Sequence, residues 1–159
     1  MGVYSEVKPC DISLKEIGKL KPDGIILSGG PASVYEHNPP IMDRKILGIG
    51  IPILGICYGL QLIAKFVNGE VLNGKLKEFG KKELHVRHNG KLLKGLAKKE
   101  TVWMSHGDLV AKLPKDFEVL ASKDSCPIAA FENNEKKIYG IQFHAEVVHT
   151  PKGNEILKN

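Results

Sequence analysis

Short apolar runs, separated by Gly, Pro and Asn, recur along the first half of the chain. The runs at residues 24–27 and 52–56 are almost continuously apolar, which is typical of strands buried on both faces of a parallel sheet. Residues 4–7 predict a weaker strand, and apolar residues recur at helical spacing over residues 12–20 and 60–67. This alternation of strands and helices predicts a parallel, helix-covered sheet with right-handed crossovers.

The second half of the chain has five short strand-like runs joined by turns such as Asn89-Gly90 and Asn133-Asn134. The runs cover residues 83–86, 101–104, 117–121, 128–131 and 138–143, and residues 152–158 predict a short helix. These runs predict an antiparallel addition to the sheet. Because no linker or repeat divides the chain, we expect residues 1–159 to be a single α/β domain. Its expected architecture is a doubly wound, mostly parallel sheet with helices on both faces and an antiparallel β addition.

The composition narrows the class of protein. The chain has 159 residues, of which 42% are hydrophobic and 26% charged, so it is long enough for one compact core. It contains no apolar run of about eighteen residues and no signal-peptide pattern, so we expect no membrane partner and a cytoplasmic location. Three cysteines without metal-binding spacing are expected to be free thiols in a reducing compartment.

The net charge of +5 does not by itself indicate a nucleic-acid partner. Lysines supply most of the positive charge, and they are scattered along the chain and interrupted by acidic residues. No zinc-finger, helix-turn-helix or aromatic-rich sheet motif accompanies them. We therefore expect a solvated lysine-rich surface and no nucleic-acid partner.

One cysteine lies between two glycines, where the apolar run at residues 52–56 turns into a helix pattern. Gly55-x-Cys57-x-Gly59 has the layout of a nucleophile elbow, in which small neighbours let strand and helix approach closely. The following helix N-terminus would favour a thiolate, and ligands of parallel sheets bind at the carboxyl ends of strands. Cys57 is therefore a candidate nucleophile, although the pentapeptide alone fits a buried structural cysteine better.

A cysteine nucleophile needs a base and an orienting group, and a candidate pair directly follows the run at residues 138–143. His144 and Glu146 are two residues apart, so both can lie on the same side of an extended segment. An exposed pair without a catalytic role is the alternative. A metal site that also includes His149 is disfavoured, because the spacing does not match a helical metalloprotease motif.

Acyl chemistry also needs backbone N–H groups that stabilise an oxyanion. The residue after the cysteine, Tyr58, would supply one of them. Gly30, in the Ser-Gly-Gly-Pro turn at residues 28–31, could supply another because glycine lets the backbone approach a substrate closely. A Gly-Gly turn is common, so the placement of all three candidate elements at strand ends carries more weight.

These motifs resemble those of the class I (triad) glutamine amidotransferases. The resemblance is carried by Gly55-Ile56-Cys57-Tyr58-Gly59-Leu60-Gln61 and by Gly140-Ile141-Gln142-Phe143-His144-x-Glu146. Within the family, the chain most resembles the amidotransferase unit of the GMP synthetases. The stretches that carry this second resemblance are residues 24–35, 102–108, 146–150 and 153–159.

The resemblance implies a Cys-His-Glu triad that hydrolyses glutamine through a γ-glutamyl thioester. Cys57 would attack the side-chain amide, His144 would move the protons, Glu146 would orient His144, and Gly30 and Tyr58 would form the oxyanion hole. The residues implied for glutamine binding are Gln61 and the segment Ser105, His106 and Gly107. No metal and no cofactor is implied in this chain. ATP and Mg²⁺ would be used by an ATP-pyrophosphatase domain or subunit, the implied partner, which converts XMP to GMP.

Two departures from the family pattern stand out. The family begins with a further strand, loop and helix of about 25 residues before residue 2, a usual length for such a unit. We therefore expect an upstream continuation in the natural protein, or another chain in that place. The usual His-Pro-Glu also reads His144-Ala145-Glu146, and alanine restrains the segment less than proline does.

Two alternatives remain open at this point. One is another class I amidotransferase, such as the type that serves anthranilate synthase, although the stretches at residues 103–108 and 147–150 argue against it. The other is an inactive module that only binds its synthetase partner.

Overall fold

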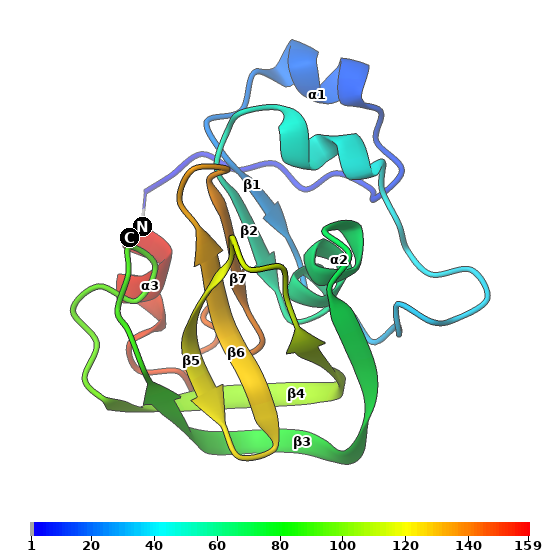
Figure 1. The fold of residues 1–159 in the computed structure, drawn as a ribbon. Coiled ribbons are helices and arrows are strands. Elements are labelled where there is room, and N and C mark those ends of the chain that lie inside the picture. The colour runs from blue at the N-terminus through cyan, green and yellow to red at the C-terminus, as the bar shows by residue number, and fades with distance from the viewer. Residues whose placement is uncertain (1) are drawn as a thin grey trace.

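The computed structural model describes residues 2–159, except for the side chains of residues 74–76. Its described residues form one seven-stranded sheet in the order β1-β2-β7-β6-β5-β3-β4 (Figure 1). The elements are α1 (Leu14–Leu20), β1 (Ile25–Leu27), the 3-10 helix η1 (Arg44–Gly48), β2 (Ile53–Ile56), α2 (Tyr58–Phe66), β3 (Glu70–Val86), β4 (Lys99–Lys112), β5 (Glu118–Lys123), β6 (Cys126–Asn133), β7 (Ile138–Ile141) and α3 (Gly153–Lys158).

The sheet is mixed, and the expectation of a mostly parallel sheet is wrong. β1 and β7 both run parallel to β2, whereas the pairs β7–β6, β6–β5, β5–β3 and β3–β4 are antiparallel. The physical reason lies in the connections, because strands joined by short turns, such as β5–β6 and β6–β7, can only pair antiparallel. The parallel part is therefore confined to three strands at one side of the sheet.

Helices cover both faces of the sheet, as the sequence predicts. Ile46 of η1 and Leu60 of α2 lie in one buried cluster, whereas Ile156 of α3 lies in a second one. Figure 1 shows α2 and α3 on opposite sides of the central strands. In the part of the chain that the structure describes, no helix combines the length and the apolar character needed to cross a membrane.

Residues 4–7 are not a strand, which corrects the sequence-based expectation. Tyr4 and Val7 are 85% and 99% exposed, and no strand of the described sheet pairs with this segment. A strand is stabilised by backbone pairing and by burial of one face, and this segment has neither.

β3 and β4 form a hairpin that is much longer than the predicted runs at residues 83–86 and 101–104. They pair from Glu70 opposite Lys112 to His85 opposite Lys99, with register shifts near Glu70 and between Asn73 and Glu78. Figure 1 shows this hairpin running across the end of the central strands. It therefore brings β4 next to the segment that carries the predicted site.

Candidate active site

Cys57 occupies the sharp turn between β2 and α2, with φ 52° and ψ −106°. This positive φ is unusual for a residue with a side chain and is a strained feature typical of functional turns. The glycines on either side permit the turn. A Cβ at Gly59 would lie 2.0 Å from the carbonyl oxygen of Leu27, and one at Gly55 would lie 2.6 Å from the backbone of Gly59. The structure thus has the geometry of a nucleophile elbow.

Helix α2 presents its N-terminus at the cysteine. Tyr58 is the first residue of α2, and the intrahelical bonds begin with Gln61 N–H, which donates to Cys57 C=O at 3.2 Å. The N–H of Tyr58 is therefore one of the helix-terminal amides without an intrahelical acceptor. The side-chain hydroxyl of Tyr58 donates to the carbonyl of Pro40 at 2.6 Å, which anchors the tyrosine ring. The role of the Tyr58 N–H as an oxyanion donor stays a prediction.

His144 and Glu146 are paired directly after β7. The Nδ1 atom of His144 lies 2.6 Å from Oε1 of Glu146. Because β7 is the parallel neighbour of β2, both strand ends reach the same edge of the sheet, and Cys57 N–H donates to the carbonyl of Ile141 at 2.8 Å. The parallel pairing therefore brings together the three residues of the predicted triad.

The side chains beside His144 favour its protonated form. Its pKa rises to about 10, because of Cys57 first and Glu146 second, although burial opposes the rise. Burial alone would raise the pKa of Glu146, but the hydrogen bond and charge of His144 hold that pKa below its usual value. The arrangement can hold a protonated imidazole beside Cys57, with the carboxylate of Glu146 behind it.

The thiol itself rests against β4. The Sγ atom of Cys57 donates to the carbonyl of Ser105 at 3.4 Å. The Nε2 atom of His144 is buried and has no hydrogen-bond partner among the described residues. Nε2 is therefore free to hold or to transfer a proton within the site.

The glycine turn after β1 lies against the triad through Gly29. A Cβ at Gly29 would lie 2.9 Å from Cε1 of His144 and 3.4 Å from Cβ of Cys57, whereas a Cβ at Gly30 would meet nothing within 4 Å. Sequence reasoning selected Gly30 as the oxyanion donor and missed the contact of Gly29. The Gly-Gly pair indicated a close approach, but only the structure shows which glycine faces the imidazole. The role of Gly30 stays a prediction.

Gln61 is buried in the interior beside the site. It is 3% exposed, and its side-chain nitrogen donates to the carbonyl of Asp108 at 2.8 Å and to Oε1 of Gln142 at 3.3 Å. The side chain thus joins α2 to β4 and to the end of β7. Its expected contact with glutamine stays a prediction.

The segment Ser105, His106 and Gly107 lies on β4. The side chain of His106 is directed into the interior, where Nε2 lies 3.2 Å from Oε2 of Glu78 and burial lowers the pKa of the imidazole. His106 is 5% exposed, and its Nδ1 lies 2.9 Å from the carbonyl oxygen of Asp108. The contact of residues 105–107 with glutamine stays a prediction.

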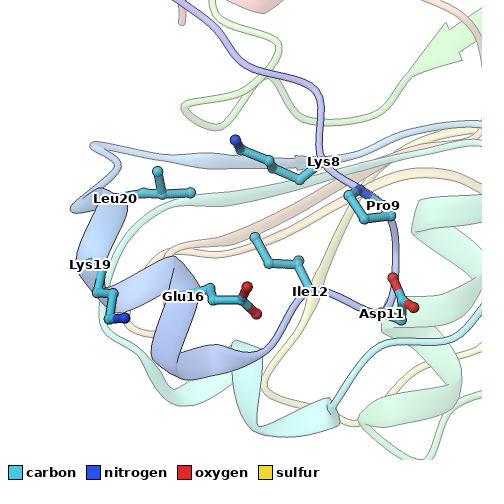
Figure 2. Close-up of a pocket in the computed structure, with 7 residues that line it drawn as sticks. All are labelled: Lys8, Pro9, Asp11, Ile12, Glu16, Lys19 and Leu20. Carbon is cyan, nitrogen blue, oxygen red and sulfur yellow. The ribbon is translucent and has the colours of Figure 1, made fainter.

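The described residues contain no group of three or more His, Cys, Asp or Glu side chains arranged to hold a metal ion. Figure 2 shows a surface hollow elsewhere, between the N-terminal segment and α1, with Lys8, Ile12 and Glu16 among its lining residues. None of the predicted site residues lines this hollow. The predicted nucleophile Cys57 instead follows β2, and His144 follows β7.

The chain matches a known family along its whole length. The family model described as glutamine amidotransferase class-I matches residues 1–159. The chain is 54% identical over 158 residues to the glutamine-hydrolyzing GMP synthase of Caldicellulosiruptor saccharolyticus and 50% identical over 159 residues to that of Staphylococcus carnosus. These alignments cover 99% and 100% of the chain but 31% of each relative, so the chain spans about a third of the curated relatives.

Solved structures share the fold. A crystal structure described as that of a GMP synthase subunit from Thermoplasma acidophilum superposes with a TM-score of 0.84 and 35% identity, covering 96% of this chain and 77% of that one. A glutamine amidotransferase of Thermotoga maritima superposes with a TM-score of 0.73 and 26% identity, covering 86% and 59% of the two chains. With a family match over all its residues and a fold shared across most of its length, this chain belongs to the class-I glutamine amidotransferases.

Proposed function

We propose that this chain hydrolyses glutamine to glutamate and ammonia as the amidotransferase part of a GMP synthase. The observation that supports this most directly is the pairing of β2 with β7, which brings the strained Cys57 elbow to the His144–Glu146 pair. The identity of about half to bacterial GMP synthases supports this class of amidotransferase over the anthranilate synthase type.

The first chemical step is acylation of the cysteine. The Cys57 thiolate attacks the side-chain amide carbon of glutamine, and the carbonyl becomes an oxyanion that accepts hydrogen bonds from the N–H groups of Tyr58 and Gly30. The intermediate then collapses, the C–N bond breaks, and the His144 imidazolium donates its proton to the leaving nitrogen. Ammonia departs and a γ-glutamyl thioester remains on Cys57.

The second step is hydrolysis of the thioester. His144 takes a proton from a water molecule, whose oxygen attacks the thioester carbon. The C–S bond breaks, the new carboxyl group gives its proton to the solvent as glutamate is released, and the thiolate and imidazolium pair is restored. Throughout the cycle Glu146 holds Nδ1, which keeps Nε2 free for proton transfer. Gln61 and the backbone of residues 105–107 are the proposed contacts for glutamine.

The ammonia would be consumed by a separate synthetase unit. We infer a partner ATP-pyrophosphatase domain or subunit, which uses ATP and Mg²⁺ to adenylate XMP and then replaces AMP by ammonia to give GMP. The support for this partner is the description of the relatives as GMP synthases. The chemistry proposed for residues 2–159 uses only their own side chains and backbone amides. We also propose that the protein is located in the cytoplasm.

The test is glutamate release from glutamine, measured for this chain alone and with an ATP-pyrophosphatase unit, ATP, Mg²⁺ and XMP. The Cys57→Ala variant serves as the blank. We expect release that depends on Cys57, and GMP formation in the complete mixture. Cys57-dependent glutamate release without GMP, in a mixture whose synthetase makes GMP from added ammonia, would contradict the GMP synthase assignment. Absence of release from folded protein in every mixture would contradict the glutaminase itself.

A further inference from the structure

His144 follows the last residue of β7, so a regular strand pairing does not hold its backbone. Two links to Trp103 of β4 hold it instead. The N–H of His144 donates to the carbonyl of Trp103 at 2.9 Å. Its carbonyl accepts a hydrogen bond of 2.6 Å from the hydroxyl of Thr150, which in turn accepts from the N–H of Trp103 at 3.0 Å.

In a regular strand pairing, two direct hydrogen bonds would join the backbones of His144 and Trp103, but only one is direct here. The hydroxyl of Thr150 bridges the two groups of the other. It lies between the two groups that a strand pairing would join directly, and Thr150 is 4% exposed. One oxygen atom accepts one bond and donates the other, which uses both capacities of a hydroxyl group. Among the natural side chains, serine offers the same geometry on a similarly short stem.

The neighbouring residues strengthen this link. The ring of Trp103 lies against the ring of His149, with centroids 4.5 Å apart and planes inclined by 37°. The segment from His144 to Thr150 thus contacts β4 at both of its ends. The same strand supplies Ser105, whose carbonyl accepts from the Cys57 thiol. β4 therefore contacts both the segment of the proposed base, His144, and the proposed nucleophile, Cys57.

We propose that Thr150 is a positioning residue of the triad, whose hydroxyl sets the backbone of His144 relative to Cys57 by fastening it to Trp103. This inference rests on the proposed glutaminase function. Thr150 has no direct contact with the imidazole or the thiol in the bonds described above, so it acts through the placement of His144. Catalysis depends on such placement, because a misplacement of about 1 Å can reduce a rate about a hundredfold.

The test compares Thr150→Val, which keeps the shape and removes the hydroxyl, with Thr150→Ser, which keeps the hydroxyl. Thr101→Val is the matched control, because Thr101 lies exposed on the same strand β4. We expect kcat for glutamate release to fall roughly tenfold or more in Thr150→Val with little change in KM. Thr150→Ser should stay within about threefold of the parent, and Thr101→Val should be unchanged.

A second readout needs no glutaminase turnover. The rate of alkylation of Cys57 by iodoacetamide is followed against pH, and mass spectrometry identifies the modified residue because Cys10 is exposed. In Thr150→Val we expect slower alkylation near neutral pH, where the thiolate depends on His144, and an unchanged rate at high pH, where it does not. Equal high-pH rates also show that the folded site is intact.

The outcomes separate this inference from the proposed function. Loss of kcat and of neutral-pH alkylation in Thr150→Val, rescued in Thr150→Ser, supports the positioning role. A Thr150→Val protein that only melts earlier, with parental kcat and alkylation profile, overturns it, as does a serine variant as slow as the valine variant. If Thr150→Val does not fold, Thr150→Ala is measured against the same criteria. A parent that releases no glutamate overturns the proposed function, while alkylation still tests the placement of His144.

Discussion

The two segments that carry the proposed triad are held in different ways. The Cys57 segment is fixed by its own backbone, because no side chain fits between β2 and α2 at Gly55 or between α2 and β1 at Gly59. The His144 segment is irregular and is fastened to β4 by one backbone bond and by the hydroxyl of Thr150. The comparison teaches that changes on the cysteine side should affect the fold, whereas changes on the histidine side should affect the rate.

The strongest test of the cysteine side is Gly59→Ala. The added Cβ would lie 2.0 Å from the carbonyl oxygen of Leu27, so α2 and β1 would have to separate. We expect the free energy of unfolding to fall by about 3 kcal/mol, measured by denaturant titration. Gly18→Ala is the control, because its Cβ would meet nothing and alanine favours the helix α1 by about 0.5 kcal/mol. Equal stability of Gly59→Ala and the parent would contradict this account.

On the histidine side, the largest effect is expected from Glu146→Gln. Glu146 raises the pKa of His144, so its neutralisation should lower that pKa from about 10 towards the ordinary value. A histidine deprotonates as the pH rises through its pKa, so the alkaline decline of kcat should begin at lower pH in the variant. We also expect kcat at its optimum to fall roughly a hundredfold. An alkaline limit at the parental pH, in a profile measured from pH 6 to 11, would show that Glu146 does not tune His144.

Gly29→Ala tests where the two sides meet. Its Cβ would lie 2.9 Å from Cε1 of His144, so the imidazole must shift, whereas the same change at Gly30 meets open space. We expect kcat to fall about tenfold in Gly29→Ala and to fall less in Gly30→Ala, whose N–H is retained. Melting temperatures of both variants should stay close to that of the parent. A larger loss of kcat at Gly30 than at Gly29 would reverse the assignment of the close contact.

The smallest effect is expected from Ala145→Pro. Ala145 is buried, and its N–H makes no hydrogen bond among the described residues, so a proline removes no bond there. Proline fixes φ and would restrain the segment between His144 and Glu146, so we expect kcat to rise about twofold to fivefold. Steady-state kinetics of glutamate release check this. A variant no faster than the parent would show that the segment is already held rigidly.

The sequence predicts those parts of the molecule whose signal is local. The elbow at Cys57, the strand before His144 and the helix α2 each carry their own pattern of glycines or apolar residues, and the structure has all three. Residues 4–7 carry a strand pattern too, but a strand also needs a neighbour, which no local pattern can supply.

The long hairpin was missed for a different reason. Along β4 alternate positions from Val102 to Val110 are buried, but two of them are the polar residues His106 and Asp108. Buried positions alternate along this whole stretch of β4, but apolar residues do not. A strand predicted from apolar residues alone therefore ends too early. The contacts of Gly29 and Thr150 were equally hidden, because each depends on a segment more than 40 positions away along the chain.

The pairing of β2 with β7 also has a consequence for the order of folding. It joins Gly55 to Gly140, so the cysteine and the histidine meet only after a large loop has closed. Contacts between such distant positions form slowly, because their loop-closure entropy precedes any gain from packing. During synthesis, a nascent chain that already contains the elbow cysteine would still lack the histidine that activates it. We therefore expect the reactive thiolate to arise as one of the last events of folding.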